Sequence, residues 1–229
     1  MELDDLQQIA SAIAHEVRNP IAAIRALAST GDSLYDGLGD DERREFFRLI
    51  DDEAERLSQV AEEVSTALKL ETGSLAYDLR DASIGDLVRE AAEHTPHGEH
   101  PLTIEVQGEL RARIDRTRLG EVVTQLVDNA VRFSPADAPI LVRAARSNGH
   151  ALIEVSDAGP GIPPERRQEI FGRFSHVRPP GYEEVPGPGL GLFICRAHVG
   201  AHGGLIEVFE APSSSGGGTM LRVEIPMER

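Results

Sequence analysis

The chain has 229 residues, a net charge of −16 and an apolar fraction of 40%, which predict a packed protein of one large domain or two small ones. The negative charge excludes nucleic acid as an expected partner, because phosphate backbones attract basic surfaces. No run approaches the ~20 consecutive apolar residues of a membrane span, and a single cysteine excludes an internal disulfide framework. We therefore expect a cytoplasmic chain without a membrane span, or the cytoplasmic part of a membrane-anchored protein.

The first 72 residues are predicted to form two helices. Apolar residues recur at spacings of three and four over residues 6–27 and again over 46–68. Turn-forming residues over 31–40 separate the two patterns, and the second helix is expected to stop near Thr72. A two-helix hairpin cannot bury its apolar stripe alone. The pattern therefore predicts an all-α helical hairpin that forms a dimeric four-helix bundle with a second copy of the chain.

His15 is predicted to lie on the polar side of the first helix. At about 100° per residue, Ile13 and Val17 fall about 40° apart, whereas His15 lies about 200° from Ile13. Asn19 shares the face of His15. Glu16, beside it, can hold the proton on one ring nitrogen, so that the other nitrogen can act as a nucleophile. An ordinary surface histidine fits the same position, but the metalloprotease motif H-E-x-x-H is excluded because residue 19 is Asn.

From about residue 75 onward, short strands are mixed with helices. Strands and helices without a regular β-α-β alternation favour an α+β two-layer sandwich. Pro- and Gly-rich stretches predict loops at 159–164 and 178–191, and Ser213–Gly218 is predicted to be a hairpin loop. The predicted strands are 102–106, 111–114, 140–145, 151–156, 205–209 and 220–225, and the predicted helices are 83–93, 115–133 and 188–202.

Two segments of this second region carry side chains suited to a nucleotide. Gln125, Asn129 and Arg132 share one helix face, where an amide oxygen suits Mg²⁺ and a guanidinium suits phosphate. A solvated helix face fits the same three residues. Asp157 ends a predicted strand, where its carboxylate can accept a hydrogen bond from the adenine amino group. The glycines that follow Asp157 let the backbone approach the ring.

A third segment supplies a phosphate site without lysine. Gly187-Pro188-Gly189-Leu190-Gly191 opens the last long predicted helix, whose free N–H groups and positive dipole end attract phosphate. Lys69 is the only lysine of the chain. Both the P-loop and the strand lysine of a protein-kinase fold are therefore missing. Any ATP must be held by another route.

The motifs, taken together, resemble one family. Ala14-His15-Glu16-Val17-Arg18-Asn19-Pro20 resembles the phosphoacceptor box of sensor histidine kinases, whose pattern is H-E-[LV]-[KR]-[TN]-P. Four segments resemble the N, G1, F and G2 boxes of that family's ATPase domain, a fold shared with Hsp90 and MutL-type ATPases. They are residues 125–135, 157–163, 171–174 and 187–192, and Gly217-Gly218-Thr219 resembles the final glycine box. The resemblance covers residues 1–226.

The resemblance implies domains, a reaction and partners. Residues 1–72 would be the dimerisation and histidine phosphotransfer domain, and residues 73–229 the catalytic ATP-binding domain. His15 would accept the γ-phosphoryl group of ATP, with Glu16 as the base, and pass it to an aspartate of a response regulator receiver domain. Asn19 would orient water when that partner is dephosphorylated. Asn129 would bind Mg²⁺, and the implied nucleotide-binding residues are Gln125, Asn129, Arg132, Phe133, Asp157, Gly159, Gly161, Ile162, Phe174, Gly187, Gly189, Leu190, Gly191, Leu192 and Thr219.

The sequence also departs from the family pattern. Gln125 stands where the N box begins with Asn, Pro188 replaces the commoner Thr or Ser, and the lid over 163–186 is short and rich in proline. Two other classes stay open: a module that binds ATP and uses the hairpin only to dimerise, and a serine kinase or anti-sigma factor of the same ATPase superfamily. The intact phosphoacceptor box argues against the first class, and the presence of the hairpin argues against the second.

Two groups of histidines are not assigned a function from the sequence. His94, His97 and His100 are spaced by threes in a predicted loop, but no cysteine accompanies them, which disfavours a metal site. His198 and His202 lie four residues apart on the last long helix. They are expected to pack against neighbours or to face solvent.

Overall fold

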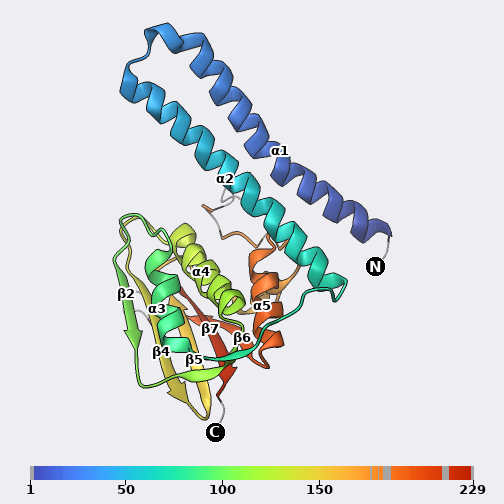
Figure 1. The fold of residues 1–229 in the computed structure, drawn as a ribbon, viewed down its shortest axis with the longest axis vertical. Coiled ribbons are helices and arrows are strands. Elements are labelled where there is room, and N and C mark those ends of the chain that lie inside the picture. The colour runs from blue at the N-terminus through green and yellow to red at the C-terminus, as the bar shows by residue number, and fades with distance from the viewer. Residues whose placement is uncertain (1–2, 176, 180, 183–186, 213–216, 228–229) are drawn as a thin grey trace.

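The computed structural model describes residues 3–175, 177–179, 181–182, 187–212 and 217–227. A long helical hairpin projects from an α/β unit (Figure 1). Helices α1 (Leu3–Leu34) and α2 (Asp40–Glu71) form the hairpin, and a single 3-10 turn (Tyr35–Gly37) joins them. The predicted hairpin is therefore present, and its second helix ends within one residue of the predicted position.

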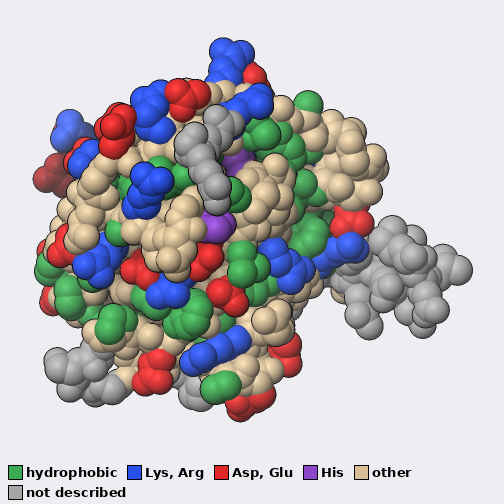
Figure 2. Space-filling model, turned by 90° about the horizontal axis from the view of Figure 1, so that it is seen from below, with side chains coloured by type: hydrophobic (Ala, Val, Ile, Leu, Met, Phe, Trp, Pro, Cys, Tyr) green, Lys and Arg blue, Asp and Glu red, His purple; other side chains and the backbone are tan. Residues whose placement is uncertain are grey.

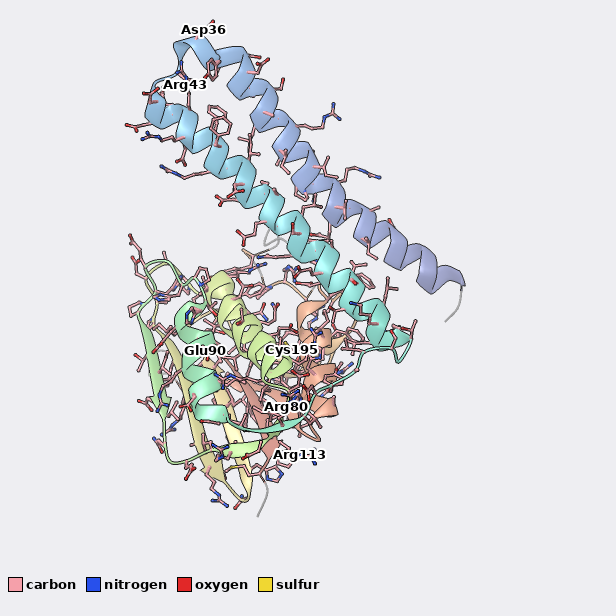
Figure 3. The ribbon with its side chains drawn as sticks, in the orientation of Figure 1. Asp36, Arg43, Arg80, Glu90, Arg113 and Cys195 are labelled. Carbon is pink, nitrogen blue, oxygen red and sulfur yellow. The ribbon has the colours of Figure 1, made fainter. Side chains whose placement is uncertain are left out.

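The connection between the two helices is shorter than the sequence predicts. The turn-forming residues indicate an interruption over 31–40, but α1 continues to Leu34. The Ser33 hydroxyl donates to the Ser29 carbonyl at 2.8 Å, so this polar side chain is satisfied within the helix. Arg43 donates to the Tyr35 carbonyl at 2.7 Å and holds the turn from α2 (Figure 3). Packing between the two helices overrides the local turn preference.

A five-stranded mixed sheet forms the base of the α/β unit, in the order β2-β4-β5-β7-β6. Strand β2 runs parallel to β4, and the other neighbouring strands are antiparallel. Helices α3, α4 and α5 cover one face of the sheet, which confirms the two-layer sandwich (Figure 1). The bounds are β1 (Arg80–Ser83), α3 (Ile84–His94), β2 (Leu102–Val106), β3 (Arg111–Ile114), α4 (Arg116–Phe133), β4 (Ile140–Ser147), β5 (His150–Ser156), α5 (Gly191–Ala201), β6 (Leu205–Glu210) and β7 (Thr219–Pro226).

Two elements of the α/β unit differ from the prediction. Strand β1, which pairs with β3 in a separate two-stranded sheet, is not predicted from the sequence. It is only four residues long and carries no apolar alternation. Helix α5 begins at Gly191 rather than at 188, because Gly189 has φ +67°, which no right-handed helix contains. Residues 213–216 of the predicted hairpin loop lie outside the described residues, and β6 and β7 on either side of them pair antiparallel.

One hydrophobic core lies between the sheet and its helices. It is filled by aliphatic side chains, such as Leu119 and Leu126 of α4 and Ile153 of β5, each at most 1% exposed. Cys195 of α5 is buried in the same core (Figure 3). Because α4 and α5 are anchored on their apolar sides, their polar residues are held in fixed positions.

The charges on the surface are mixed in sign. At the end of the molecule remote from the hairpin tip, acidic and basic side chains are interspersed (Figure 2). Several arginines there are paired, such as Arg80 with Asp78 and Arg111 with Asp81. Exposed pairs of this kind contribute little to stability. In the described part of the chain, no helix combines the length and the apolar character needed to cross a bilayer.

Candidate functional site

A cavity of about 270 Å³ lies where α4, α5 and the end of β5 meet, and α2 of the hairpin closes one side of it. Side chains and backbone from segments far apart in the sequence form its wall. The sequence-predicted residues that line it are Gln125, Asn129, Arg132, Phe133, Asp157, Gly161, Ile162, Gly187, Gly189, Gly191, Leu192 and Thr219. The motifs that the sequence singles out therefore converge on one cavity.

Helix α4 contributes three polar side chains to this wall. Arg132 Nε lies 2.7 Å from Asp128 Oδ2, an ion pair within the helix that orients the guanidinium. Asn129 Nδ2 is buried and makes no hydrogen bond to the described residues. Gln125 packs against Gly191, where an added Cβ would lie 2.6 Å from the Gln125 carboxamide carbon. A side chain at 191 would therefore displace the Gln125 carboxamide from its place at the cavity wall.

Asp157 is fixed by the backbone around it. Its Oδ1 accepts the N–H of Gly159 at 2.8 Å and the N–H of Thr219 at 2.9 Å, whereas Oδ2 accepts neither. Burial raises the pKa of the Asp157 carboxyl, and the bonds from Thr219 and Gly159 act against that rise. A carboxylate held in this way presents a defined acceptor to a ligand.

Three predicted residues lie behind the wall rather than in it: Gly159, Phe174 and Leu190. Ser175 N–H donates to the Gly189 carbonyl at 3.1 Å, and an added Cβ at Gly189 would lie 2.4 Å from the Ser175 carbonyl oxygen. Phe174, just before this contact, has φ +54°. Leu190 is 1% exposed, and its carbonyl accepts the N–H of Ile194 in the first turn of α5. These residues support the glycine-rich segment and do not form the cavity surface.

The hairpin meets the cavity through Glu16. His15 and Asn19 are exposed on α1 and do not line the cavity. Glu16 is 9% exposed, and its Oε2 accepts the N–H of Gly187 at 3.2 Å. The carboxylate next to the predicted phosphoacceptor thus holds one of the glycine-segment N–H groups that suit phosphate.

Several residues of the wall are not predicted from the sequence, Glu63 and Arg178 among them. Glu63 of α2 lines the cavity, and burial raises the pKa of its carboxyl from 4.5 to about 7, although nearby Arg132 acts against that rise. Arg178 also lines the cavity and donates to the Gly187 carbonyl at 3.4 Å. As a basic residue of the predicted lid, Arg178 could have been found, but Glu63 is one of many acidic residues on α2. Residues 176, 180 and 183–186 of the lid lie outside the described residues.

The three histidines over residues 94–100 lie close to backbone carbonyls. Nδ1 of His94, His97 and His100 lies at hydrogen-bonding distance from the backbone carbonyls of Glu90, His100 and Ala138, respectively. Over the described residues, no group of three or more His, Cys, Asp or Glu side chains is arranged to hold a metal ion. A divalent cation would need further ligands from a bound phosphate group.

The chain is similar to known proteins over nearly its whole length. Residues 5–73 match the family model of the His Kinase A (phospho-acceptor) domain, and residues 114–229 match that of the Histidine kinase-, DNA gyrase B-, and HSP90-like ATPase. Sensor histidine kinase TmoS of Ectopseudomonas mendocina is 30% identical over 220 residues, which are 94% of this chain and 22% of TmoS. This chain therefore spans about a fifth of that relative.

Two solved structures share the fold of both parts. Full-length ShkA in complex with AMPPNP has a TM-score of 0.66 at 23% identity, covering 96% of this chain and 45% of ShkA. Histidine kinase ThkA in complex with response regulator protein TrrA has a TM-score of 0.68 at 24% identity. That match covers 99% of this chain and 63% of the ThkA chain.

Proposed function

Because the chain belongs to the sensor histidine kinases of two-component systems, we propose that it transfers the γ-phosphoryl group of ATP to His15 and then to an aspartate of a response regulator. The observation that carries this proposal is the convergence of the glycine segments, Asn129 and Asp157 on one cavity, beside a hairpin with an exposed histidine. Within this proposal, residues 1–72 act as the dimerisation and phosphotransfer domain and residues 73–229 as the ATP-binding domain.

The cavity offers separate groups for the two ends of ATP. Asp157 Oδ2 accepts the adenine amino group, and Ile162 and Leu192 pack against the ring. The N–H groups at Gly189 and Gly191 and the positive end of α5 hold the phosphates, with Arg132 and Arg178 as the cations. The fold shared with ShkA, which was solved with AMPPNP, supports ATP as the ligand.

The residues present fit a magnesium ion brought in with the nucleotide. Asn129 has a buried carboxamide without a hydrogen bond at Nδ2, and an exchange of its oxygen and nitrogen positions would direct the oxygen to the same point. Mg²⁺ prefers a few protein oxygens together with phosphate oxygens and waters. Bound at Asn129, with Gln125 next to it on α4, the ion would neutralise phosphate charge.

In the proposed reaction, one imidazole nitrogen of His15 forms a bond to the γ-phosphorus, and the bond from phosphorus to the bridging oxygen of ADP breaks. The proton on the other ring nitrogen is held by Glu16, which must first release the N–H of Gly187. Alignment and charge neutralisation supply most of the rate enhancement in phosphoryl transfer. Because His15 does not line the cavity and Glu16 is bonded to Gly187, the ATP-binding domain and the hairpin must move relative to each other before His15 reacts.

The proposal includes two protein partners. A second copy of the chain covers the apolar face of the hairpin, and a receiver domain docks near His15. The solved complex of ThkA with the response regulator TrrA supports a partner of this class. Asn19, on the same face of α1 as His15, orients water if the kinase also dephosphorylates the regulator. Because ATP is the substrate, we place this reaction in the cytoplasm.

Incubation with γ-labelled ATP tests the proposal. We expect acid-labile, alkali-stable label on the wild-type chain and none on His15→Gln, whereas His94→Gln, a control at another exposed histidine, keeps the label. Nucleotide binding without any label would favour the dimerising module, and acid-stable label on a serine would favour the serine kinase. Either result would sink the assignment to His15.

A further inference from the structure

The segment that joins α2 to β1 is attached to the ATP-binding domain at Tyr77. Residues 72–79 leave the end of α2 and cross the ends of α5 and α4 (Figure 1). Tyr77 is half-buried there, and its ring meets His198 and His202 edge-on, with centroid separations of 5.7 and 6.1 Å. Tyr77 therefore packs against two aromatic rings at the C-terminal end of α5, of which His202 is the residue just after the helix.

A chain of polar contacts runs from Tyr77 into the domain. Tyr77 Oη lies 2.9 Å from His198 Nδ1, and His198 Nε2 lies 3.3 Å from Glu121 Oε2. His198 itself is completely buried. In its neutral form with the proton on Nε2, the imidazole accepts the tyrosine O–H and directs its own N–H at the carboxylate. The Tyr77 hydroxyl is then satisfied by His198, whereas Nε2 faces the Glu121 carboxylate at 3.3 Å without the alignment of a hydrogen bond in the described structure.

The charges around the contact favour this arrangement. Burial raises the pKa of the Tyr77 phenol, so its O–H remains a donor at neutral pH. Partial burial alone would raise the pKa of Glu121, but hydrogen bonds from His198 and Arg118 outweigh it, and the pKa is lowered. Glu121 is therefore ionised, and its carboxylate attracts the polar edge of the His198 ring at 3.3 Å.

A second set of bonds holds the next residue of the segment. Asp78 N–H donates to Asp115 Oδ2 at 3.0 Å, and Asp115 N–H donates to His202 Nε2 at 2.9 Å. Nδ1 of His202 lies 2.7 Å from the His198 carbonyl. The connecting segment is thus fixed at two successive residues, once by a side chain and once by the backbone.

The two helices that receive Tyr77 are the two that form the cavity. Glu121 precedes Gln125 by one turn of α4, and His198 follows Gly191 by two turns of α5. Gln125 and Gly191 are in contact at the cavity wall. At about 1.5 Å per residue, the Glu121–His198 contact lies about 6 Å along α4 from the Gln125 level.

We propose that Tyr77 is a positioning residue for phosphoryl transfer: through His198 and Glu121 it fixes the hairpin's connecting segment to both nucleotide-binding helices. The inference rests on the proposed function. The N–H of Ser74 is bonded to the Lys69 carbonyl at the end of α2, so with Tyr77 held only residues 75 and 76 link the hairpin to the domain. A short tether keeps the effective concentration of His15 near the cavity high. Release of Tyr77 lengthens the tether by one residue, because Asp78 stays bonded to Asp115, and it relaxes the direction in which the segment leaves the domain.

Steady-state kinetics of His15 phosphorylation at varied ATP distinguish this role from simple stabilisation. In Tyr77→Phe, which keeps the ring and removes the hydroxyl, we expect kcat to fall about fivefold while KM for ATP stays within about twofold. Tyr35→Phe at the hairpin tip is the matched control and should match the wild type. Equal changes in kcat and KM, or no fall in kcat, would overturn the inference.

A double-variant test uses the proposed chain itself. If Tyr77 acts through His198 and Glu121, adding Glu121→Gln to Tyr77→Phe should lower kcat no further than the single variants do. If instead the losses in kcat of the two single variants multiply in the double variant, Tyr77 does not act through His198 and Glu121. Hydrogen exchange at residues 74–79 gives a readout that does not depend on activity. If exchange in this segment is no faster in Tyr77→Phe than in the wild type, Tyr77 does not hold the segment and the inference is wrong. Absence of label on the wild-type chain would instead identify failure of the proposed function.

Discussion

The two oxygens of the Asp157 carboxylate have different environments. Because Oδ1 accepts both backbone N–H groups, the carboxamide oxygen of Asp157→Asn can keep those bonds, which turns the NH₂ group toward the adenine amino group. Two donors then face each other. We expect the Kd for ATP to rise about 30-fold, equivalent to about 2 kcal/mol, with little change in Tm. Calorimetric titration measures this, with Asp137→Asn as the control for loss of an exposed charge; an unchanged Kd would remove Asp157 from adenine recognition.

Individual site residues could be predicted where the sequence motif itself determines the backbone. Asp157 lies within two residues of the glycine whose N–H fixes it, and the Asn129 face of α4 follows from helical spacing alone. Glu63 and Tyr77 could not be found in this way. Their partners are far away in the sequence, 121 residues away in the case of Tyr77 and His198, and nothing local marks them. His198 and His202 are buried, which is the first of the two alternatives, packing or solvent exposure, that the sequence left open.

At the scale of elements, the hairpin leaves large apolar side chains uncovered. Phe47 is 68% exposed and Leu68 is 60% exposed, both on α2, and Ile21 and Leu34 of α1 are also exposed. Surfaces of this kind usually mark an interface. We expect Phe47→Glu to convert the proposed dimer to monomers in sedimentation experiments, because a buried unpaired carboxylate is costly. Gln59→Glu, an added charge at an exposed polar position of α2, is the control. A dimer that survives Phe47→Glu would place the interface elsewhere.

Most elements follow from the sequence because their apolar periodicity agrees with their final packing. Strands β2 and β3 have the predicted bounds, and α4 starts one residue after the predicted position. The misses have local causes. Helix α1 crosses Gly31 because α2 packs against it there, and β1 is too short to show a period. Helix α5 begins later than predicted because Gly189 has a positive φ, and apolar periodicity carries no information on the sign of φ.

At the scale of the whole molecule, three hairpin carboxylates meet the ATP-binding domain. Glu71 Oε1 lies 2.6 Å from Arg173 Nη2, Glu16 accepts the N–H of Gly187, and Glu63 lines the cavity. The last two occupy the region proposed for the phosphates. A triphosphate and these carboxylates repel each other at such short range. The docked hairpin and the bound nucleotide are therefore expected to compete, and the domain movement that the reaction needs follows from that competition.

The protonation of Glu63 should couple this docking to pH. Burial in the docked arrangement raises its pKa from 4.5 to about 7, so the docked state favours the uncharged carboxyl. The stabilisation of docking is thus fully present below pH 4.5 and is lost as the pH rises through about 7. From pH 6 to 8 we expect the docking equilibrium constant to fall about tenfold, roughly 1.4 kcal/mol, in small-angle scattering without nucleotide and with a chelator. Glu63→Gln stays uncharged and should remove this dependence, whereas Glu62→Gln, its exposed neighbour, should keep it. An identical pH response in both variants would assign the effect to another group.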